Sequence, residues 1–273
     1  MPSQEGQGGK TMCDAQLIER REYKYFVDED TVELIRNAIR PFCQLDPYSE
    51  KSPTHQYAIE SLYFDTPQFA LFWANDREAV ERFKVRVRSY PGATSDDVFL
   101  EVKRRANDVI VKSRGRISRS QWNALSRSGK IAEPEGLNKK QRKAMERFLF
   151  LSAVHHLRPV ALVRYEREAY FSLIDDYARI TFDRLICSTP KSDLAPSTST
   201  PNWRYQDHAV MQKTPSAKTL VELKFTSNTP RWLIGIVKQL DLMRSSFSKY
   251  GTAVRTWYSD NDFSDAYGKR VPA

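Results

Sequence analysis

The chain has 273 residues, enough for one large domain or two small ones, and lysine plus arginine number 43 against 34 aspartates and glutamates. The formal charge of +9 predicts an anionic partner: nucleic acid, a membrane surface or a phosphorylated small molecule. The three cysteines and four histidines lack disulfide-framework or metal-ligand spacing, and no run reaches the about 18–20 apolar residues of a membrane span, so we expect a soluble cytoplasmic protein without a transmembrane segment.

The first half of the chain is dominated by strand patterns. Residues 1–16 are rich in Gly, Gln and Ser and are expected to be disordered. A strand is predicted at 19–27, and a helix at 29–40 follows from apolar residues at helical spacing. Further strands are predicted at 56–65, 79–90, 97–106 and 108–117.

The second half mixes both patterns. Helices are predicted at 118–128, 138–157 and 230–243, and strands at 159–172, 177–187 and 218–226. The Ser-, Thr- and Pro-rich stretch 188–202 is expected to be a mobile loop, and 259–273 a polar tail. Many antiparallel-type strands with a few helices predict one α+β domain over 17–258, centred on a barrel or strongly curved sheet.

The segment Lys84-Val85-Arg86-Val87-Arg88 has an unusual alternation. Because a strand turns successive side chains to opposite faces, its three cations share one face and its two valines the other. Other predicted strands repeat the pattern, and the charged alternates are Glu22, Lys24, Glu101, Lys103, Lys112, Arg114, Arg116, Arg167, Arg179, Glu222 and Lys224.

Two interpretations of this charged face are open. Charged alternates on a single strand are typical of a solvated sheet face. Across many strands, however, arginine is prominent, and its planar fork can bind two phosphate oxygens at once. The apolar alternates would pack against helices, which would place the charged face inside the barrel, where it needs counter-charges or a bound anion.

The carboxylates on this face are candidates for holding a metal ion. Mg²⁺ and Mn²⁺ are commonly bound by one or two carboxylates together with substrate phosphates. Glu222 and Glu101 each lie beside a lysine on the same face, and Glu222 is the stronger candidate. The alternative is that each glutamate only neutralises neighbouring cations.

Nine short motifs occur in an order that resembles a known family. They are Glu22-Tyr-Lys24-Tyr25, Ser61-Leu-Tyr-Phe-Asp-Thr66, Lys84-Val-Arg-Val-Arg88, Leu100-Glu-Val-Lys103, Lys112-Ser-Arg114, Tyr165-Glu-Arg167, Arg179-Ile-Thr-Phe-Asp183, Val221-Glu-Leu-Lys224 and Ser248-Lys249-Tyr250. Over residues 18–258 the chain is similar to the VTC domain of polyphosphate polymerases, in the triphosphate tunnel metalloenzyme superfamily.

The resemblance implies an eight-stranded antiparallel β-barrel, the triphosphate tunnel, with helices packed around the outside. It implies transfer of the γ-phosphate of ATP to a growing inorganic polyphosphate chain, with release of ADP and with Mn²⁺ or Mg²⁺ as cofactor. The implied catalytic residues are Lys24, Arg86, Arg88, Lys103, Arg167, Arg179 and Lys249. The motif match also implies Lys112, Tyr165 and Ser248 as substrate-binding residues and Glu222 as a metal ligand. The charged face adds Arg114 and Lys224 as substrate-binding candidates and Glu101 as a second metal candidate.

One departure separates this chain from the hydrolase and cyclase branch of that superfamily. That branch carries a Glu-x-Glu-x-Lys signature in its first strand, whereas the corresponding segment here runs from Arg20 through Glu22 to Lys24. One metal-binding carboxylate is replaced by a cation. The departure points towards the polymerase-like branch and leaves open whether Glu22 binds metal or pairs with arginines.

Three other functions remain as alternatives. The first is a metal-dependent tripolyphosphatase or nucleoside triphosphatase in the same tunnel. The second is a non-catalytic module that binds polyphosphate or inositol phosphates. The third, nucleic-acid binding, is disfavoured because no aromatic stacking motif accompanies the basic residues. ATP and inorganic polyphosphate are the expected partners, and a membrane-protein partner is left open.

Overall fold

The computed structural model describes residues 20–258 except 108, 129–136, 176, 193, 195–201 and 227. The segments predicted as disordered N-terminus and polar tail lie outside the described residues, as does the centre of the predicted loop. The main strands are β1 (Arg20–Val27), β3 (Tyr57–Asp65), β4 (Glu81–Ser89), β5 (Asp97–Ala106), β6 (Val109–Ser118), β7 (Arg158–Ser172), β8 (Ala178–Pro190) and β10 (Thr219–Thr226).

These strands form one antiparallel sheet in the order β1-β10-β8-β7-β3-β4-β5-β6, and all eight predicted strands are confirmed. Two short strands were not predicted: β2 (Cys43–Leu45) pairs with β7, and β9 (Arg204–Tyr205) pairs with β8. The prediction of a loop from residue 188 was wrong for its first three residues. Ser188 and Thr189 continue the ladder against Val163 and Leu162, because the long β7 still offers partners there.

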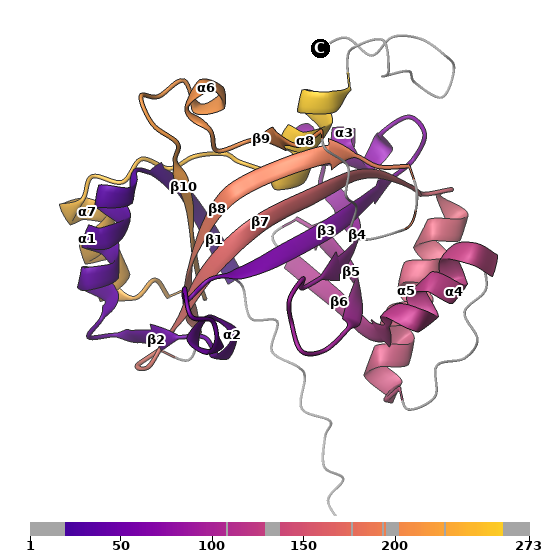
Figure 1. Ribbon diagram of the computed structural model, residues 1–273, viewed down its shortest axis with the longest axis horizontal. Coiled ribbons are helices and arrows are strands. Elements are labelled where there is room, and N and C mark those ends of the chain that lie inside the picture. Colours follow the sequence, from indigo (N-terminus) through magenta and orange to yellow (C-terminus); the bar gives the residue numbers. More distant parts are fainter. Residues whose placement is uncertain are drawn as a thin grey trace, which may run out of the picture.

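The sheet curls until strands distant in its order face one another (Figure 1). The carboxylate of Glu22 on β1 lies 3.6 Å from the ammonium of Lys103 on β5. In the described part of the chain, no backbone pairing joins β1 to β6, so the ladder stays open along that seam. The predicted α+β class and barrel-like antiparallel sheet are confirmed, with one concave inner face.

Two helices cover the outer face of β1, β10 and β8. Helices α1 (Glu29–Ile39) and α7 (Arg231–Gln239) lie next to each other in Figure 1 and share one buried cluster with this sheet. Ile35 and Leu233 pack there with Val221 and Phe225, which alternate with the charged residues of β10. The apolar alternates of the strand therefore face the helices, as the sequence predicted.

A second helix pair covers β4, β5 and β6. Helices α4 (Arg119–Ser128) and α5 (Lys139–Val154) contribute Trp122 and Phe148 to a cluster that contains Val85 and Leu100. Helix α5 approaches β6 closely at Gly115, where a Cβ atom would lie 3.2 Å from backbone atoms of that helix. Both helices were predicted, and α5 is slightly shorter at each end than the predicted range 138–157.

Helix α8 (Lys249–Trp257) was not predicted, and it breaks the rule that helices lie outside. Its residues Tyr250, Ala253 and Val254 pack against Ala161 and Val163 of β7, which share the strand face of Tyr165. The helix therefore fills one end of the barrel interior. Three short helices were also unpredicted: α2 (Pro47–Lys51), α3 (Ala70–Asp76) and α6 (Ala209–Gln212).

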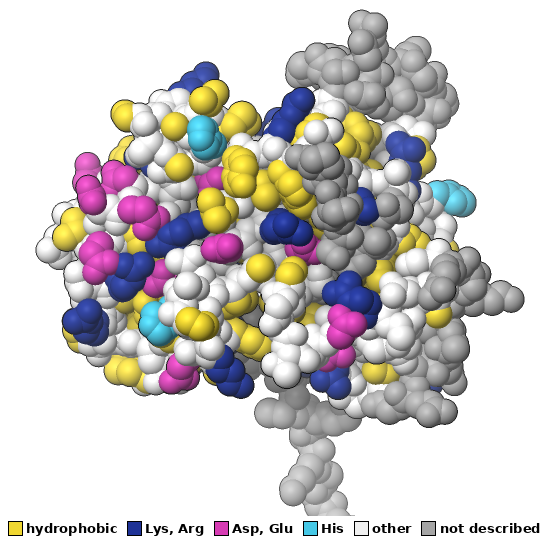
Figure 2. Space-filling view, viewed as in Figure 1, with side chains coloured by type: hydrophobic (Ala, Val, Ile, Leu, Met, Phe, Trp, Pro, Cys, Tyr) yellow, Lys and Arg dark blue, Asp and Glu magenta, His cyan; other side chains and the backbone are white. Residues whose placement is uncertain are grey.

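The convex surface seen in Figure 2 mixes basic and acidic side chains. On the helix-covered side of the sheet, Glu168 accepts hydrogen bonds from Arg36 and Arg184, and Arg184 also binds Glu29. These four charges neutralise one another. Among the described residues, no helix is both long and apolar enough to cross a membrane.

Candidate functional site

Charged side chains from seven strands and from the start of α8 gather on the inner face. We call this set the inner-face cluster. Its cations are Lys24, Lys84, Arg86, Arg88, Lys103, Lys112, Arg114, Arg167, Lys224 and Lys249. Its carboxylates are Glu22, Glu101, Asp183 and Glu222. Strand alternation explains the strand members, because each lies two residues from the next along its strand.

Glu222 on β10 is the centre of one half of the cluster. Its carboxylate lies 2.5 Å from Lys224, 3.0 Å from Lys249 and 3.3 Å from Arg167. Burial raises the pKa of Glu222, but these three cations outweigh burial and hold the pKa well below its usual range. Glu222 is therefore ionised whenever the protein is folded near neutral pH.

Asp183 on β8 was not among the predicted site residues. It is fully buried, with its carboxylate 2.7 Å from Arg167 and 2.6 Å from Lys249. Burial raises the pKa of Asp183, while Arg167 and Lys249 lower it to a net value below the ordinary one. The signal for its role was in the sequence, since Asp183 follows Arg179 and Thr181 at two-residue spacing.

Glu101 on β5 is the centre of the other half. Its carboxylate lies 2.7 Å from Arg86, 3.1 Å from Lys112 and 3.4 Å from Arg114. Burial raises the pKa of Glu101, but Arg86, Arg88 and Lys112 lower it far more. Its buried Oε1 atom is the one that lies within ion-pair distance of Lys112 and Arg114, so cations compensate both oxygens of this carboxylate.

Arg88 differs from the other buried cations of the cluster. It is 7% exposed and donates to two neutral hydroxyls, Ser61 Oγ at 3.3 Å and Tyr165 Oη at 3.2 Å. No carboxylate of the described residues lies within ion-pair distance of it. Unlike Arg86 and Arg167, it therefore has no directly paired carboxylate that would compete with a bound anion.

Glu22 joins the two walls of the barrel. It pairs with Lys24 at 3.2 Å on its own strand and with Lys103 at 3.6 Å across the interior. Burial and Glu222 raise the pKa of Glu22, but Lys224, Lys103 and Lys24 lower it to about 2. The structure thus gives Glu22 several cation partners.

Two lysines of the cluster titrate close to neutral pH. Burial, together with Lys24 and Lys103, lowers the pKa of Lys84 to about 7. Burial lowers the pKa of Lys112 to about 8, although Glu101 opposes the shift. Lys84 also donates to Ser248 Oγ at 3.1 Å, and Ser248 in turn caps α8 by accepting from the Gly251 amide.

Tyr63 and Arg179 depart most from the sequence prediction. Tyr63, which was not predicted, stacks on Tyr250 with ring centroids 4.9 Å apart and accepts from Arg86 at 3.0 Å. Arg179, which was predicted as catalytic, is exposed, with its guanidinium 5.9 Å from the Tyr177 ring. Its register partner is Lys224, so it shares the inner face but lies near the open end.

The donor set fits a hard divalent cation that takes much of its shell from phosphate. No group of three metal-ligating side chains meets the requirements for a metal site within the described residues. Glu222 nevertheless lies on the strand between those of Glu22 and Asp183, and its charge raises the pKa of both. A cation bound beside Glu222 would relieve this repulsion.

Comparison with known proteins places this geometry in a family. The profile of the VTC domain matches residues 19–258, which is most of the chain. The chain belongs to the VTC domain family. A search of curated proteins finds no match to the sequence.

Solved structures related to this VTC domain are distant in sequence. A Bacillus halodurans protein described as an adenylate cyclase has a TM-score of 0.46 and 11% identity, covering 89% of this chain and 100% of its own. The triclinic structure of the Mimivirus capping enzyme triphosphatase has a TM-score of 0.31 and 13% identity, covering 84% of this chain and 88% of its own.

Proposed function

We propose that this VTC domain is a polyphosphate polymerase that transfers the γ-phosphate of ATP to the end of an inorganic polyphosphate chain. A terminal oxygen of the chain forms a bond to the γ-phosphorus. The bond from that phosphorus to the bridging oxygen breaks, and ADP leaves with the electron pair. Phosphoryl transfer of this kind depends mainly on in-line positioning and on charge stabilisation.

The observation that carries the proposal is the state of the inner-face carboxylates. Glu22, Glu101, Asp183 and Glu222 each pair with two or more cations, and each has a lowered pKa. A carboxylate so strongly stabilised as an anion is a poor general base. Attack by water would need such a base, whereas a polyphosphate end is already ionised. The carboxylates therefore favour a phosphate nucleophile.

The cations supply the remaining chemistry. Arg88, whose guanidinium contacts only neutral hydroxyls, is placed to bind a transferring phosphoryl group. Arg86 and Lys112 share Glu101, and can orient phosphate oxygens while staying fixed by that carboxylate. Mn²⁺ or Mg²⁺, held by Glu222 and in part by Glu101, would withdraw charge from bridging phosphate oxygens.

A second candidate is a metal-dependent triphosphatase, which Tyr63 favours. Burial raises the pKa of the Tyr63 hydroxyl, but Arg86 and Arg88 lower it below its ordinary value. The shift favours the phenolate form of Tyr63, and that form could accept a proton from water. If the protein is a triphosphatase, Tyr63→Phe should abolish hydrolysis. If it is a polyphosphate polymerase, the same substitution should leave chain growth intact.

Product analysis distinguishes the candidates. Pure protein is incubated with ATP and Mn²⁺, and the products are followed by phosphorus NMR. The polymerase gives ADP together with the signal of internal polyphosphate groups. Orthophosphate without chain formation would overturn it in favour of the triphosphatase, and binding without turnover would favour a non-catalytic module.

A further inference from the structure

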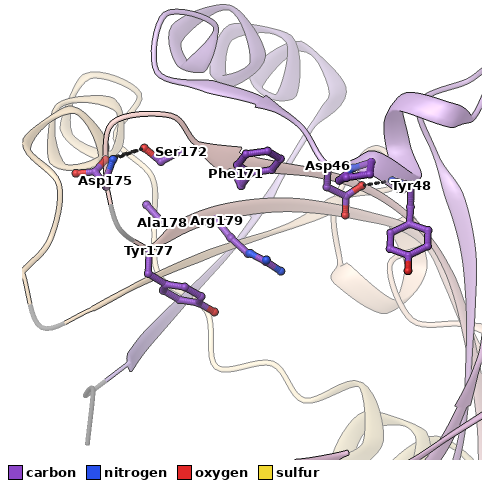
Figure 3. Close-up of a pocket in the computed structure, with 9 residues that line it drawn as sticks. Asp46, Tyr48, Phe171, Ser172, Asp175, Tyr177, Ala178 and Arg179 are labelled. Atoms are coloured by element: carbon purple, nitrogen blue, oxygen red, sulfur yellow. Dashed lines mark hydrogen bonds between the residues drawn. The ribbon is translucent and has the colours of Figure 1, made fainter. Parts of the chain in front are cut away.

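A pocket opens at the end of the barrel opposite α8. It has a volume of about 300 Å³ and lies between α2 and the turn that joins β7 to β8 (Figure 3). Its lining includes Tyr48, Phe171, Tyr177 and Arg179. This volume is at the lower limit of about 300–1,000 Å³ that is typical of small-molecule sites.

The pocket borders the inner-face cluster through neighbouring residues on the strands. Arg179 lines the pocket and lies opposite Lys224 in the strand register. On the other side, Tyr48 packs against Tyr57 with ring centroids 5.7 Å apart, and Tyr57 lies opposite Arg167 in the register of β3 and β7. A ligand could therefore place one part in the pocket and extend a phosphate group towards the cluster.

The lining does not suit a phosphate chain. Two carboxylates, Asp46 and Asp175, line the pocket and would repel phosphate. The rest of the wall includes three aromatic side chains, Tyr48, Phe171 and Tyr177. Tyr48 is 62% exposed, with its ring stacked parallel to Tyr90. Aromatic faces beside hydrogen-bond acceptors match a planar group that carries N–H or O–H donors.

The position of α8 makes this the open end. Tyr250 and its neighbours on α8 pack against the inner face at the other end, so a nucleotide whose terminal phosphates reach the cluster would have its nucleoside at this mouth. We propose that the pocket binds the nucleobase and ribose of the nucleoside triphosphate. The inference rests on the proposed use of ATP, and it assigns specificity for a nucleotide over inorganic triphosphate to Tyr48 and Tyr177.

Calorimetric titration of the intact protein with Mg²⁺ and either ATP or inorganic triphosphate tests the assignment. Stacking on an aromatic ring contributes about a tenfold gain in affinity. Tyr48→Ala and Tyr177→Ala should each weaken ATP binding by about this factor, leaving binding of inorganic triphosphate unchanged. Tyr48→Phe should bind both ligands as the unmodified protein does.

The matched control is Tyr205→Ala, since Tyr205 is 45% exposed on β9 and does not line the pocket. It should change neither affinity. Equal weakening of both ligands by Tyr48→Ala and Tyr177→Ala, or no weakening of ATP by either, would overturn the assignment. A failure of the proposed polymerase function would be seen in a different measurement. The protein would then form no polyphosphate in the product analysis, while calorimetry would still show tighter binding of ATP than of inorganic triphosphate.

Discussion

Glu22 and Lys103 lie 3.6 Å apart although β10, β8, β7, β3 and β4 separate their strands in the sheet. This contact shows that the inner face is enclosed. Charges on such a face act on one another through little water, so their mutual effects are stronger than on an open sheet.

Arg88 is expected to serve substrate rather than fold. Arg88→Gln should reduce turnover by about 100- to 1,000-fold, because a fixed donor to the transferring phosphoryl group is lost. The substitution should destabilise the fold less than loss of Arg167 does, because Arg88 forms no direct ion pair with a carboxylate of the described residues and stabilises Glu101 only from a longer distance. Steady-state kinetics and chemical denaturation measure the two effects.

Arg167→Gln is the matched comparison. It removes a partner 2.7 Å from the fully buried Asp183, and should destabilise the fold by about 3 kcal/mol. Equal destabilisation by the two substitutions would contradict the distinction between Arg88 and Arg167.

Glu222 is expected to limit anion binding while it supports catalysis. Glu222→Gln frees Lys224, Lys249 and Arg167 from a carboxylate, so inorganic triphosphate should bind at least as tightly without metal. Metal-dependent turnover should fall by about 100-fold or more, as for loss of a group that stabilises the transition state. Calorimetry and product analysis check the two outcomes.

The control for Glu222 is Glu81→Gln, because the Glu81 side chain is 66% exposed and its pair with Arg104 contributes little. It should alter neither binding nor turnover. Weaker triphosphate binding by Glu222→Gln would show that the carboxylate mainly positions its three cations.

Anion binding should weaken as the pH rises from about 6.5 to 9. Lys84 has a pKa of about 7 and Lys112 of about 8 in the folded protein, so both lose their protons across this range. A bound polyanion favours the protonated forms, and binding near pH 8 should therefore take up protons. Titrations in buffers of different ionisation enthalpy measure this uptake.

The same shifts determine the stability of the protein without ligand. Both lysines have folded pKa values below their unfolded ones, so between about pH 7 and 10 the unfolded chain binds more protons and stability rises with pH. Lys84→Met should remove part of this rise and part of the proton uptake. A pH-independent affinity for inorganic triphosphate would contradict the lowered pKa values.

Tyr250 should hold α8 in the barrel through Asp65. Asp65 is fully buried and accepts the Tyr250 hydroxyl along with the amides of Leu71 and Phe72. Tyr250→Phe should lower the unfolding free energy by about 1–3 kcal/mol, because the buried Asp65 carboxylate loses one of its hydrogen-bond donors. Thermal unfolding measures the cost, and Tyr205→Phe on the surface should leave the midpoint unchanged.

The strands and their charged faces could be predicted because alternation is a local signal. Lys84, Arg86 and Arg88 share a face in any strand, whatever lies beyond it. Depth along the barrel is not local: Arg179 has the correct face, yet it lies close to the turn between β7 and β8 and ends at the pocket. Periodicity specifies which way a side chain points, not how far inside it lies.

Asp183 and α8 were missed for a related reason. Asp183 lies within a sequence motif, but only the folded positions of Arg167 and Lys249 show that it shares both cations with Glu222. The helix that carries Lys249 has nine residues and includes Gly251, and its formation depends on packing against the inner face. Contacts between distant segments determine both features.

Lys249 follows every strand of the sheet in the sequence, and it is the first residue of α8. As the chain is synthesised from its N-terminus, the strands up to β10 emerge before this lysine does. Until Lys249 emerges, the carboxylates of Asp183 and Glu222 lack one of the two cations that they share. The inner-face cluster is therefore completed last, after its sheet has formed.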